Sequence, residues 1–149
     1  MRVTFRVDSV PVSQPRQRHR IITSKGRSFS QNYTPAKHPA TQYKSDVKMA
    51  AAVAHPTSGP LSGALHVDVL FVMPRPASLV WKKRPMPREA HTKKPDIDNL
   101  LKSTFDALKD LMWRDDSQVA AVTACKVIAS GNETPHVLIT VKEEIGEYQ

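Results

Sequence analysis

The sequence predicts an α+β fold: a single domain in which two main helices pack on a mixed or antiparallel β-sheet. Strand-like and helix-like segments follow one another as strand, hairpin, helix, strand, helix, strand and strand, with no internal repeat. The length of 149 residues is enough for one hydrophobic core and short for two. Apolar residues make up 40% of the chain, and no apolar run approaches the roughly 18 residues that a membrane span requires. We therefore expect residues 1–149 to form one domain.

The first two predicted elements are a strand and a hairpin. The segment RVTFRV at residues 2–7 alternates apolar and basic or polar side chains, which is typical of a half-buried strand. A basic loop follows at about residues 13–39, and Gly26 is suited to turn a short hairpin inside it because glycine tolerates a positive φ.

A helix is predicted from near Thr41 to just before Pro56, with Lys44 on its outer side. Its apolar face is expected to hold Tyr43, Val47, Ala50 or Ala51, and Ala54, which recur at helical spacing. Residues 63–74 then predict the second long strand. The basic loop at residues 73–95 contains five prolines and seven lysines or arginines. A loop of this length in a compact domain is typically functional or mobile.

The C-terminal part predicts a helix at about residues 99–112 and two strands at 117–128 and 136–142. Leu101, Phe105, Leu108 and Met112 form an apolar stripe on that helix and are expected in the core. The single cysteine, Cys125, rules out an intrachain disulfide and is expected to be a small buried residue of its strand. Residues 143–149 predict a short, loose acidic tail.

Charge divides the chain into two parts. Residues 1–95 hold 17 lysines and arginines against 4 acidic residues, whereas residues 96–149 hold 5 against 10. This asymmetry indicates a polyanion-binding part joined to an acidic site, and nucleic acid is the favoured polyanion. An anionic membrane surface is less favoured, because the cations lie in proline-rich loops rather than on an amphipathic helix. We expect a cytoplasmic protein, since the start of the chain has no apolar signal segment.

The acidic residues have two interpretations. Asp98 is a natural N-cap for the following helix, and Asp96 also lies near the positive end of the helix dipole, where each acid contributes about 0.3–1 kcal/mol without any catalytic role. Asp106 is expected to pair with Lys102 on the helix surface. However, Asp115 and Asp116 follow the helix, at the end where the dipole disfavours acids.

If the chain folds back, like charges about 5 Å apart repel by roughly 3 kcal/mol per pair at an effective dielectric near 20. A hard cation such as Mg²⁺ offsets this repulsion. With Lys102 beside the acids, the pattern favours metal-assisted hydrolysis of a phosphodiester.

The segment KPDIDNLLKSTFDAL followed by DDSQV, within residues 94–119, resembles the RusA family of Holliday-junction resolvases. The resemblance implies a RusA-like fold, and that Asp96, Asp98 and Asp116 are metal-binding catalytic residues, with Asp115 less certain. It implies that Lys102 is the catalytic lysine. It also implies Mg²⁺ or Mn²⁺ as cofactor, a homodimer, and paired nicks in four-way DNA junctions in a bacterial or phage setting.

The DNA-binding residues are inferred from the charge of the two basic loops. They are Arg16, Arg18, Arg20, Lys25, Arg27, Lys82, Lys83, Arg84, Lys93 and Lys94. Trp81 is expected either to stack on an unpaired base or to anchor its loop, and Trp113 to pack in the core or at a dimer contact. A non-catalytic DNA-binding protein with structural aspartates is the alternative function. A glycosyltransferase that uses D-x-D to bind Mn²⁺ is a third, disfavoured by the short, basic chain.

Overall fold

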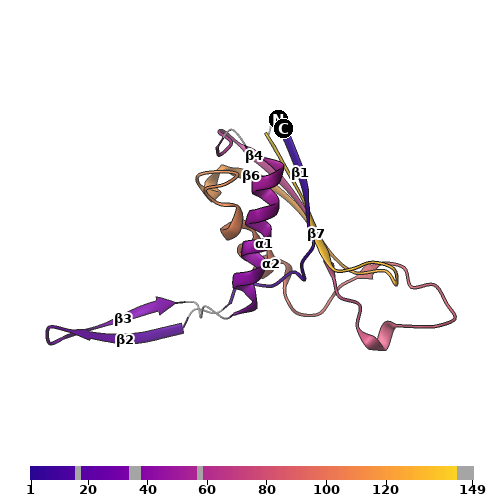
Figure 1. Ribbon diagram of the computed structural model, residues 1–149, viewed down its shortest axis with the longest axis horizontal. Helices are drawn as coiled ribbons and strands as arrows, with labels where there is room; N and C mark the ends of the chain where they lie inside the picture. Colours follow the sequence, from indigo (N-terminus) through magenta and orange to yellow (C-terminus); the bar gives the residue numbers. More distant parts are fainter. Residues whose placement is uncertain (16–17, 34–37, 57–58, 144–149) are drawn as a thin grey trace.

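A computed structural model describes residues 1–15, 18–33, 38–56 and 59–143, without the side chains of residues 18–19 and 31–33. The predicted fold class is confirmed: a mixed five-stranded sheet and a separate two-stranded sheet accompany two helices (Figure 1). The elements in chain order are β1 (Arg2–Val7), β2 (Arg18–Ser24), β3 (Arg27–Tyr33), α1 (Pro39–Ala54), β4 (Leu65–Met73), η1 (Ala77–Leu79), β5 (Glu89–Ala90), α2 (Ile97–Leu108), η2 (Asp116–Gln118), β6 (Val119–Ile128) and β7 (His136–Glu143).

The main sheet has the strand order β1-β7-β4-β6-β5. Only β4 and β6 run parallel; each other neighbouring pair is antiparallel. Parallel neighbours need a long crossover, and the chain between β4 and β6 provides it with the loop at residues 74–96, α2 and η2. This crossover carries every acidic residue singled out in the sequence, so it is the part of the fold that positions the site.

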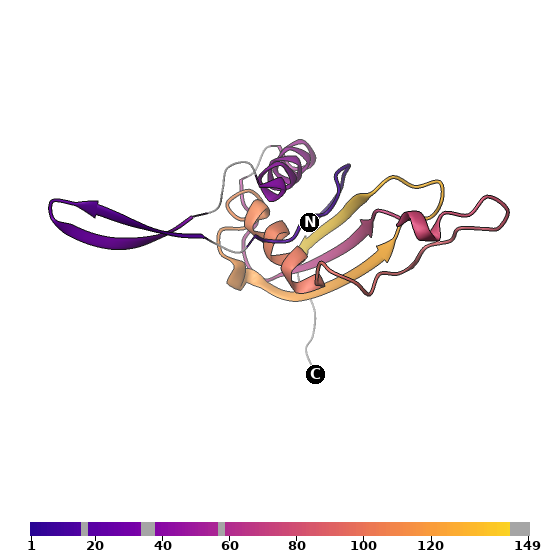
Figure 2. The same cartoon turned by 90° about the horizontal axis from the view of Figure 1, so that it is seen from below.

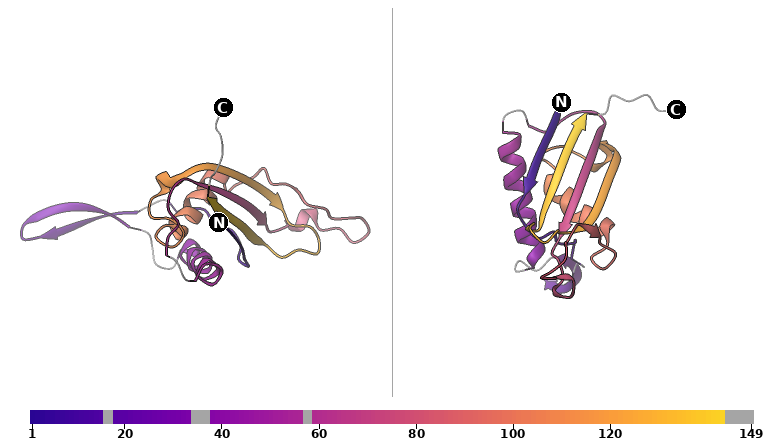
Figure 3. Two further views of the ribbon diagram at one scale, coloured as in Figure 1. Left: turned by 90° about the horizontal axis from the view of Figure 1, so that it is seen from above. Right: turned by 90° about the vertical axis from the view of Figure 1, so that its right-hand side faces the viewer.

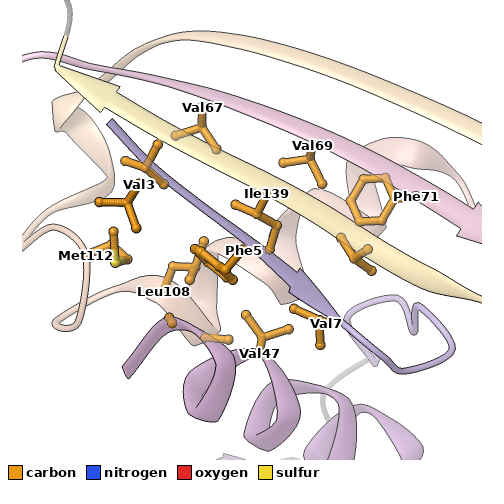
Figure 4. Close-up of a cluster of buried hydrophobic side chains, with 14 of the residues drawn as sticks. Val3, Phe5, Val7, Val47, Val67, Val69, Phe71, Leu108, Met112 and Ile139 are labelled. Carbon is orange, nitrogen blue, oxygen red and sulfur yellow. The ribbon is translucent and has the colours of Figure 1, made fainter. Parts of the chain in front are cut away.

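Both helices cover one face of the sheet, and the core lies between them and the inward-pointing strand residues (Figures 3 and 4). In β1 the alternation predicted from the sequence is observed, with every second residue buried. Fully buried side chains such as Phe71 and Leu108 each stabilise the fold by roughly 1.5–3 kcal/mol. Tyr43 of α1 and Thr104 of α2 share a buried hydrogen bond of 2.8 Å, which joins the two helices within this core.

Helix α1 begins two residues before the predicted start. His38 is its N-cap and accepts a hydrogen bond at Nδ1 from the backbone N–H of Ala40, while Pro39 occupies the first turn, where its missing N–H costs nothing. Ala51 rather than Ala50 is fully buried, and Ala54 is exposed.

Helix α2 ends at Leu108, four residues before the predicted end. Asp110 has a φ of 69°, and its backbone N–H donates to Trp113 O at 2.6 Å, so the chain turns sharply there. Aspartate tolerates this left-handed conformation better than most residues. The predicted apolar stripe is half correct, because Leu108 and Met112 are buried while Leu101 and Phe105 are only partly covered.

The face of the sheet opposite the helices is open to solvent. Cys125 lies on this face of β6 next to Leu70 of β4, and its side chain is exposed. The prediction that Cys125 is buried is therefore wrong. Both helices cover the other face, so among the described residues no helix shields this small apolar residue from solvent.

The two predicted basic loops extend from opposite ends of the molecule (Figure 2). In the first, β2 and β3 form the hairpin predicted from Gly26, and the turn residues Lys25 and Gly26 have φ values of 51° and 75°. In the second, residues 74–95 include η1 and the short edge strand β5. The predicted acidic tail lies outside the described residues beyond Glu143. Within the described ranges, no helix has the length and apolar character needed to cross a membrane.

Candidate active site

Helix α2 begins with the two aspartates of the D-x-D motif. Asp96 is the N-cap residue, and its backbone carbonyl accepts the first helical hydrogen bond, from Leu100 N at 3.1 Å. The prediction that Asp98 is the N-cap is thus wrong: Ile97 packs against the core, which draws it into the first turn and places Asp98 there as well. The Asp96 side chain makes no capping hydrogen bond. Both carboxylates are exposed, so their oxygens remain available to a ligand.

Asp98, Lys102 and Asp106 follow one another at intervals of four on α2 and therefore share one side of the helix. They line a cavity of about 420 Å³ together with Gln14, Leu101, Phe105 and Asp116. Asp98 lies in the first turn of α2 and Asp116 lies in η2. Both side chains nevertheless line the same cavity. The partly covered Leu101 and Phe105 line this cavity and also pack against the core.

Asp106 is engaged by the neighbouring helix. It accepts a hydrogen bond from Lys44 Nζ at 2.8 Å, and the Lys44 side chain is only 16% exposed. The predictions that Asp106 pairs with Lys102 and that Lys44 faces outward are both wrong, because α1 packs alongside α2 and brings Lys44 to it. Lys102 makes no ion pair with any described residue, so its ammonium stands exposed at the cavity wall.

The turn η2 assigns different tasks to the adjacent Asp115 and Asp116. Asp115 is the N-cap, and its Oδ1 accepts a hydrogen bond from Ser117 N at 2.9 Å, which lowers the pKa of this carboxyl. Asp116 lines the cavity, and its Oδ1 accepts a hydrogen bond from Trp113 Nε1 at 2.7 Å. Trp113 is fully buried and stacks edge-on against Phe105, so Asp116 is held by a rigid core residue.

Gln118 explains why glutamine suits the fourth position of the DDSQ motif. Its Oε1 accepts hydrogen bonds from the backbone N–H groups of Arg114 and Asp115, at 2.9 and 3.1 Å. Its Nε2 donates to the carbonyls of Leu61 and Gly63, at 3.0 and 3.1 Å. Gln118 thus completes a capping box with Asp115 and fastens the turn to the segment before β4. The motif combines structural residues with one acid that is free to face the cavity.

The segment after β1 supplies a wall of the cavity that nothing in the sequence singled out. Gln14 N donates to Asn99 O at 3.0 Å, and Ser103 Oγ donates to Val12 O at 2.6 Å, so the segment lies along the first turns of α2. Gln14 Oε1 is buried and receives no hydrogen bond from any residue in the described part of the chain. This leaves a carboxamide at the cavity whose acceptor is unused.

A second cavity, of about 590 Å³, adjoins the first at Asp98. Its wall includes Asp96, His91, Lys93 and Lys126. Burial lowers the pKa of His91, and the positive charge of Lys126 lowers it further. Lys126, on β6, was also not singled out in the sequence; its neighbours in the chain read as an ordinary strand.

The carboxylates fit a hydrated Mg²⁺ or Mn²⁺ better than a closed metal cage. Among the residues that the structure describes, no three acidic, histidine or cysteine side chains are close enough to form a ready-made metal site. Mg²⁺ does not need one, since it commonly binds through one or two carboxylates and completes its shell with waters and substrate phosphates. Asp98 and Asp116 provide such a pair at one cavity, with Asp96 at the adjoining one. That all three aspartates surround one ion stays a prediction.

Comparison with known proteins identifies the family of the chain. A family model described as Endodeoxyribonuclease RusA matches residues 8–142. The chain belongs to the RusA family. Its members are nucleases that act on Holliday junctions, so this chain is an endonuclease of that class and the resemblance of its motifs is confirmed. It is also similar to YqaN of Bacillus subtilis (strain 168), an uncharacterized protein: the two are 30% identical over 146 residues, which are 95% of this chain and 96% of YqaN.

In this RusA-family chain, the loop at residues 74–95 uses some of its cations internally. Arg75 donates to Leu79 O at 2.7 Å and Pro87 O at 2.9 Å, and its side chain is only 6% exposed. Arg88 forms a bidentate salt bridge with Glu133, in which Nε and Nη2 donate to the two carboxylate oxygens. This salt bridge lowers the pKa of Glu133 to about 2. These two arginines hold the loop against the end of the sheet, and their guanidinium groups are engaged within the protein.

The remaining cations of this loop are exposed. They are Lys82, Lys83, Arg84, Lys93 and Lys94, all five of which were predicted to bind DNA. The Arg84 guanidinium lies 3.8 Å from the centre of the Trp81 ring, and that of Arg75 lies 5.1 Å from it. Trp81 is partly buried between these two cations, an arrangement that fits an anchor for the loop.

The hairpin of the RusA-family chain carries a second group of predicted DNA-binding residues. Arg20, Lys25 and Arg27 are exposed on it. Arg18 lies in β2, but its side chain is outside the described part, and Arg16 lies wholly outside it. Exposed cations are therefore carried by both the hairpin and the loop, which extend from opposite ends of the molecule (Figure 2).

Proposed function

We propose that this chain is a metal-dependent, structure-selective endonuclease that resolves four-way DNA junctions by hydrolysing one phosphodiester in each of two opposed strands. Asp96, Asp98 and Asp116 hold Mg²⁺ or Mn²⁺, and Lys102 acts beside them. The observation that carries the proposal is that Asp98, Lys102 and Asp116 line one cavity although 18 positions of sequence separate the outer two. Family membership supplies the substrate class.

Each residue has a task that follows from its place. When bound, a divalent ion polarises the phosphoryl oxygen, lowers the pKa of the attacking water and stabilises the leaving oxygen. Asp98 and Asp116 supply the negative charge that holds such an ion, and Trp113 fixes the direction of Asp116. The free ammonium of Lys102 stabilises the charge that develops on the phosphate. Asp115 serves as a helix cap, so Asp116 is the metal-binding member of the pair.

The paired nicks require two active sites, and we propose that a homodimer provides them, one on each of two opposed strands. The protein acts in the bacterial cytoplasm, where the junctions of replicating or recombining bacterial or phage DNA are found. Cations of the two basic segments, at about residues 13–39 and 74–95, bind the phosphates of the junction arms, with salt-sensitive affinity. These are Arg16, Arg18, Arg20, Lys25, Arg27, Lys82, Lys83, Arg84, Lys93 and Lys94.

The deciding experiment is nicking of a synthetic four-way junction by wild type and Asp98→Asn, with Mg²⁺ and with EDTA. Wild type is expected to nick opposed strands only with the ion, and Asp98→Asn to bind the junction but leave it uncut. Gel-shift titration without metal measures the binding. Cleavage by Asp98→Asn at the wild-type rate, or by wild type in EDTA, would refute the proposal in favour of another chemistry. Binding without any cleavage by wild type would favour a non-catalytic DNA-binding protein.

The DNA-binding assignment has its own test within the loop at residues 74–95. Lys82→Gln combined with Lys83→Gln removes two exposed cations, and the slope of log affinity against log salt is expected to fall by about 2. Arg88→Gln is the matched control, because its guanidinium is engaged by Glu133. An equal loss of slope in the control would show that the internal pairing does not decide which cations meet DNA.

A further inference from the structure

Lys126 is placed to fix the start of α2 rather than to neutralise its acids. It lies on β6 opposite the fully buried Phe71 of β4, and so on the helix-covered face of the sheet. Its Nζ donates to the carbonyls of Lys93 and Pro95, both at 2.6 Å. Pro95 immediately precedes Asp96. One ammonium therefore holds two carbonyls of the segment that delivers the D-x-D motif.

The backbone of Lys126 holds the same segment at a third point. His91 N donates to Lys126 O at 3.0 Å. Residues 91–95 are thus fastened to one strand residue at both ends, and α2 starts directly after the last fastening. The neighbouring strand β5 adds only two residues of pairing with β6, Glu89 and Ala90. Lys126 therefore helps to set the position of Asp96 relative to the sheet, together with the packing of Ile97 against the core.

The donors of Lys126 are directed at carbonyls and not at the acids beside it. Lys126, Asp96 and Asp98 line the same cavity, yet no ion pair joins Lys126 to either aspartate in the described structure. An ammonium has three N–H donors and the two carbonyls take two of them. Both carboxylates are therefore left for a cation even though a positive charge lies nearby.

We propose that Lys126 is a positioning residue of the cation site, which it builds by clamping the Lys93 and Pro95 carbonyls so that Asp96 and Asp98 face a common ligand. This inference rests on the proposed function, because it takes these aspartates as cation ligands. Groups that orient metal ligands from outside typically change metal affinity by about 10- to 100-fold when removed. A clamp without a role at the cation site would alter only stability.

The test exploits two effects of opposite sign. Lys126→Met removes the clamp and also a positive charge beside two carboxylates. Loss of charge alone makes cation binding tighter, whereas loss of the clamp makes it weaker. The measurement is Mn²⁺ binding to the full chain without DNA, by titration of the free-ion EPR signal. We expect Lys126→Met to bind Mn²⁺ about 10-fold more weakly than wild type. Equal or tighter binding overturns the inference.

Lys126→Arg carries the test if the methionine variant does not fold. Arginine keeps the charge but changes the reach and geometry of the donors. If Lys126 positions the site, Lys126→Arg is expected to bind Mn²⁺ more weakly than wild type. If Lys126 acts through its charge alone, the Mn²⁺ affinity of Lys126→Arg is expected to equal that of wild type. Lys142→Met is the matched control on β7, where the lysine pairs with Asp68 on the open face; its Mn²⁺ affinity is expected to equal that of wild type.

Asp98→Asn, titrated in parallel, separates this inference from the proposed function. If wild type binds Mn²⁺ and Asp98→Asn does not, the cation site stands. Unchanged binding by both Lys126 variants would then overturn the role of Lys126 alone. If Asp98→Asn binds Mn²⁺ as tightly as wild type, the cation site itself is lost and the inference falls with it.

Discussion

The entry to α2 and the turn η2 each present two aspartates at the start of a helical segment, but they treat them differently. At the entry to α2, neither carboxylate is used by the helix: Asp96 caps through its backbone position only, and Asp98 faces the cavities. At η2, both are engaged, Asp115 by Ser117 N and Asp116 by Trp113 Nε1. The first region offers exposed carboxylates that the helix does not use, and the second offers one carboxylate held by a hydrogen bond.

The difference shows how one short connection can serve folding and chemistry together. A helix start favours acids electrostatically whether or not their side chains make a hydrogen bond. At α2, the Asp96 side chain makes no capping hydrogen bond with the helix. At η2, a capping box fixes the backbone beside Asp116. Substitutions at the two regions are therefore expected to separate loss of activity from loss of stability.

The largest difference in nicking rate is expected between variants of the adjacent residues Asp116 and Asp115. Asp116→Asn removes a proposed cation ligand, and metal-derived stabilisation of several kcal/mol corresponds to a loss of nicking of about a hundredfold or more. Asp115→Asn keeps an equivalent cap, because asparagine caps as well as aspartate. Its nicking rate is expected to stay within about threefold of wild type. Single-turnover nicking of a labelled junction measures both rates. Equal losses of nicking in the two variants would contradict the assignment of Asp116 as cation ligand and Asp115 as cap.

A smaller effect is expected when the support of Asp116 is removed. Trp113→Phe keeps an aromatic ring in the core but deletes the Nε1 donor. Loss of a hydrogen bond to a charged group costs roughly 1.5–3 kcal/mol of stability. The freed carboxylate is expected to lower nicking by about 10-fold, as loss of other groups that orient metal ligands does. Urea unfolding and nicking are measured together. A stability loss without any loss of nicking would show that Asp116 needs no orientation.

Several elements and site residues could be predicted from the sequence, because they depend on local signals. The apolar alternation of β1, the glycine turn and the D-x-D motif before a helix all identified their elements or residues. The two ends of α2 could not be predicted from the sequence. Its start is set by Ile97 packing in the core, and its end by the left-handed turn at Asp110. Both depend on tertiary contacts that short-range patterns do not contain.

The partners of individual charges were the least predictable part of the site. Asp106 has Lys102 four residues before it, yet Lys44 from the other helix binds it. Gln14 and Lys126 carried no local signal, since a glutamine in a loop and a lysine in a strand are ordinary. Their importance arises because the fold brings the segment after β1, strand β6 and helix α2 together around one acidic motif. Only residues whose chemistry is unusual for their local position, such as paired aspartates, can be recognised beforehand.

Asp106 is a third carboxylate on the wall of the cavity that Asp98 and Asp116 line. Its bond with Lys44 is a partly exposed ion pair, with Asp106 59% exposed, and such pairs contribute about 0.2–1 kcal/mol. Asp106→Asn is therefore expected to lower stability by no more than this and to leave nicking within about threefold of wild type. Thermal unfolding and the junction assay check the two values. A large loss of nicking would place Asp106 among the proposed cation ligands and Lys44 beside them.

The smallest effect is the pH dependence of the Asp115 cap. The hydrogen bond from Ser117 N lowers the pKa of Asp115 below that of the unfolded chain. A lowered pKa means that the charged cap stabilises the fold above the unfolded value, near 3.9, and that this contribution disappears as the pH falls through the folded value. Asp115→Asn has no charge to titrate. The urea midpoint of wild type is therefore expected to exceed that of Asp115→Asn slightly at neutral pH and to converge with it in acid. A difference that stays constant with pH would mean that the carboxylate acts by shape alone, and η2 would then differ from the entry to α2 in geometry but not in electrostatics.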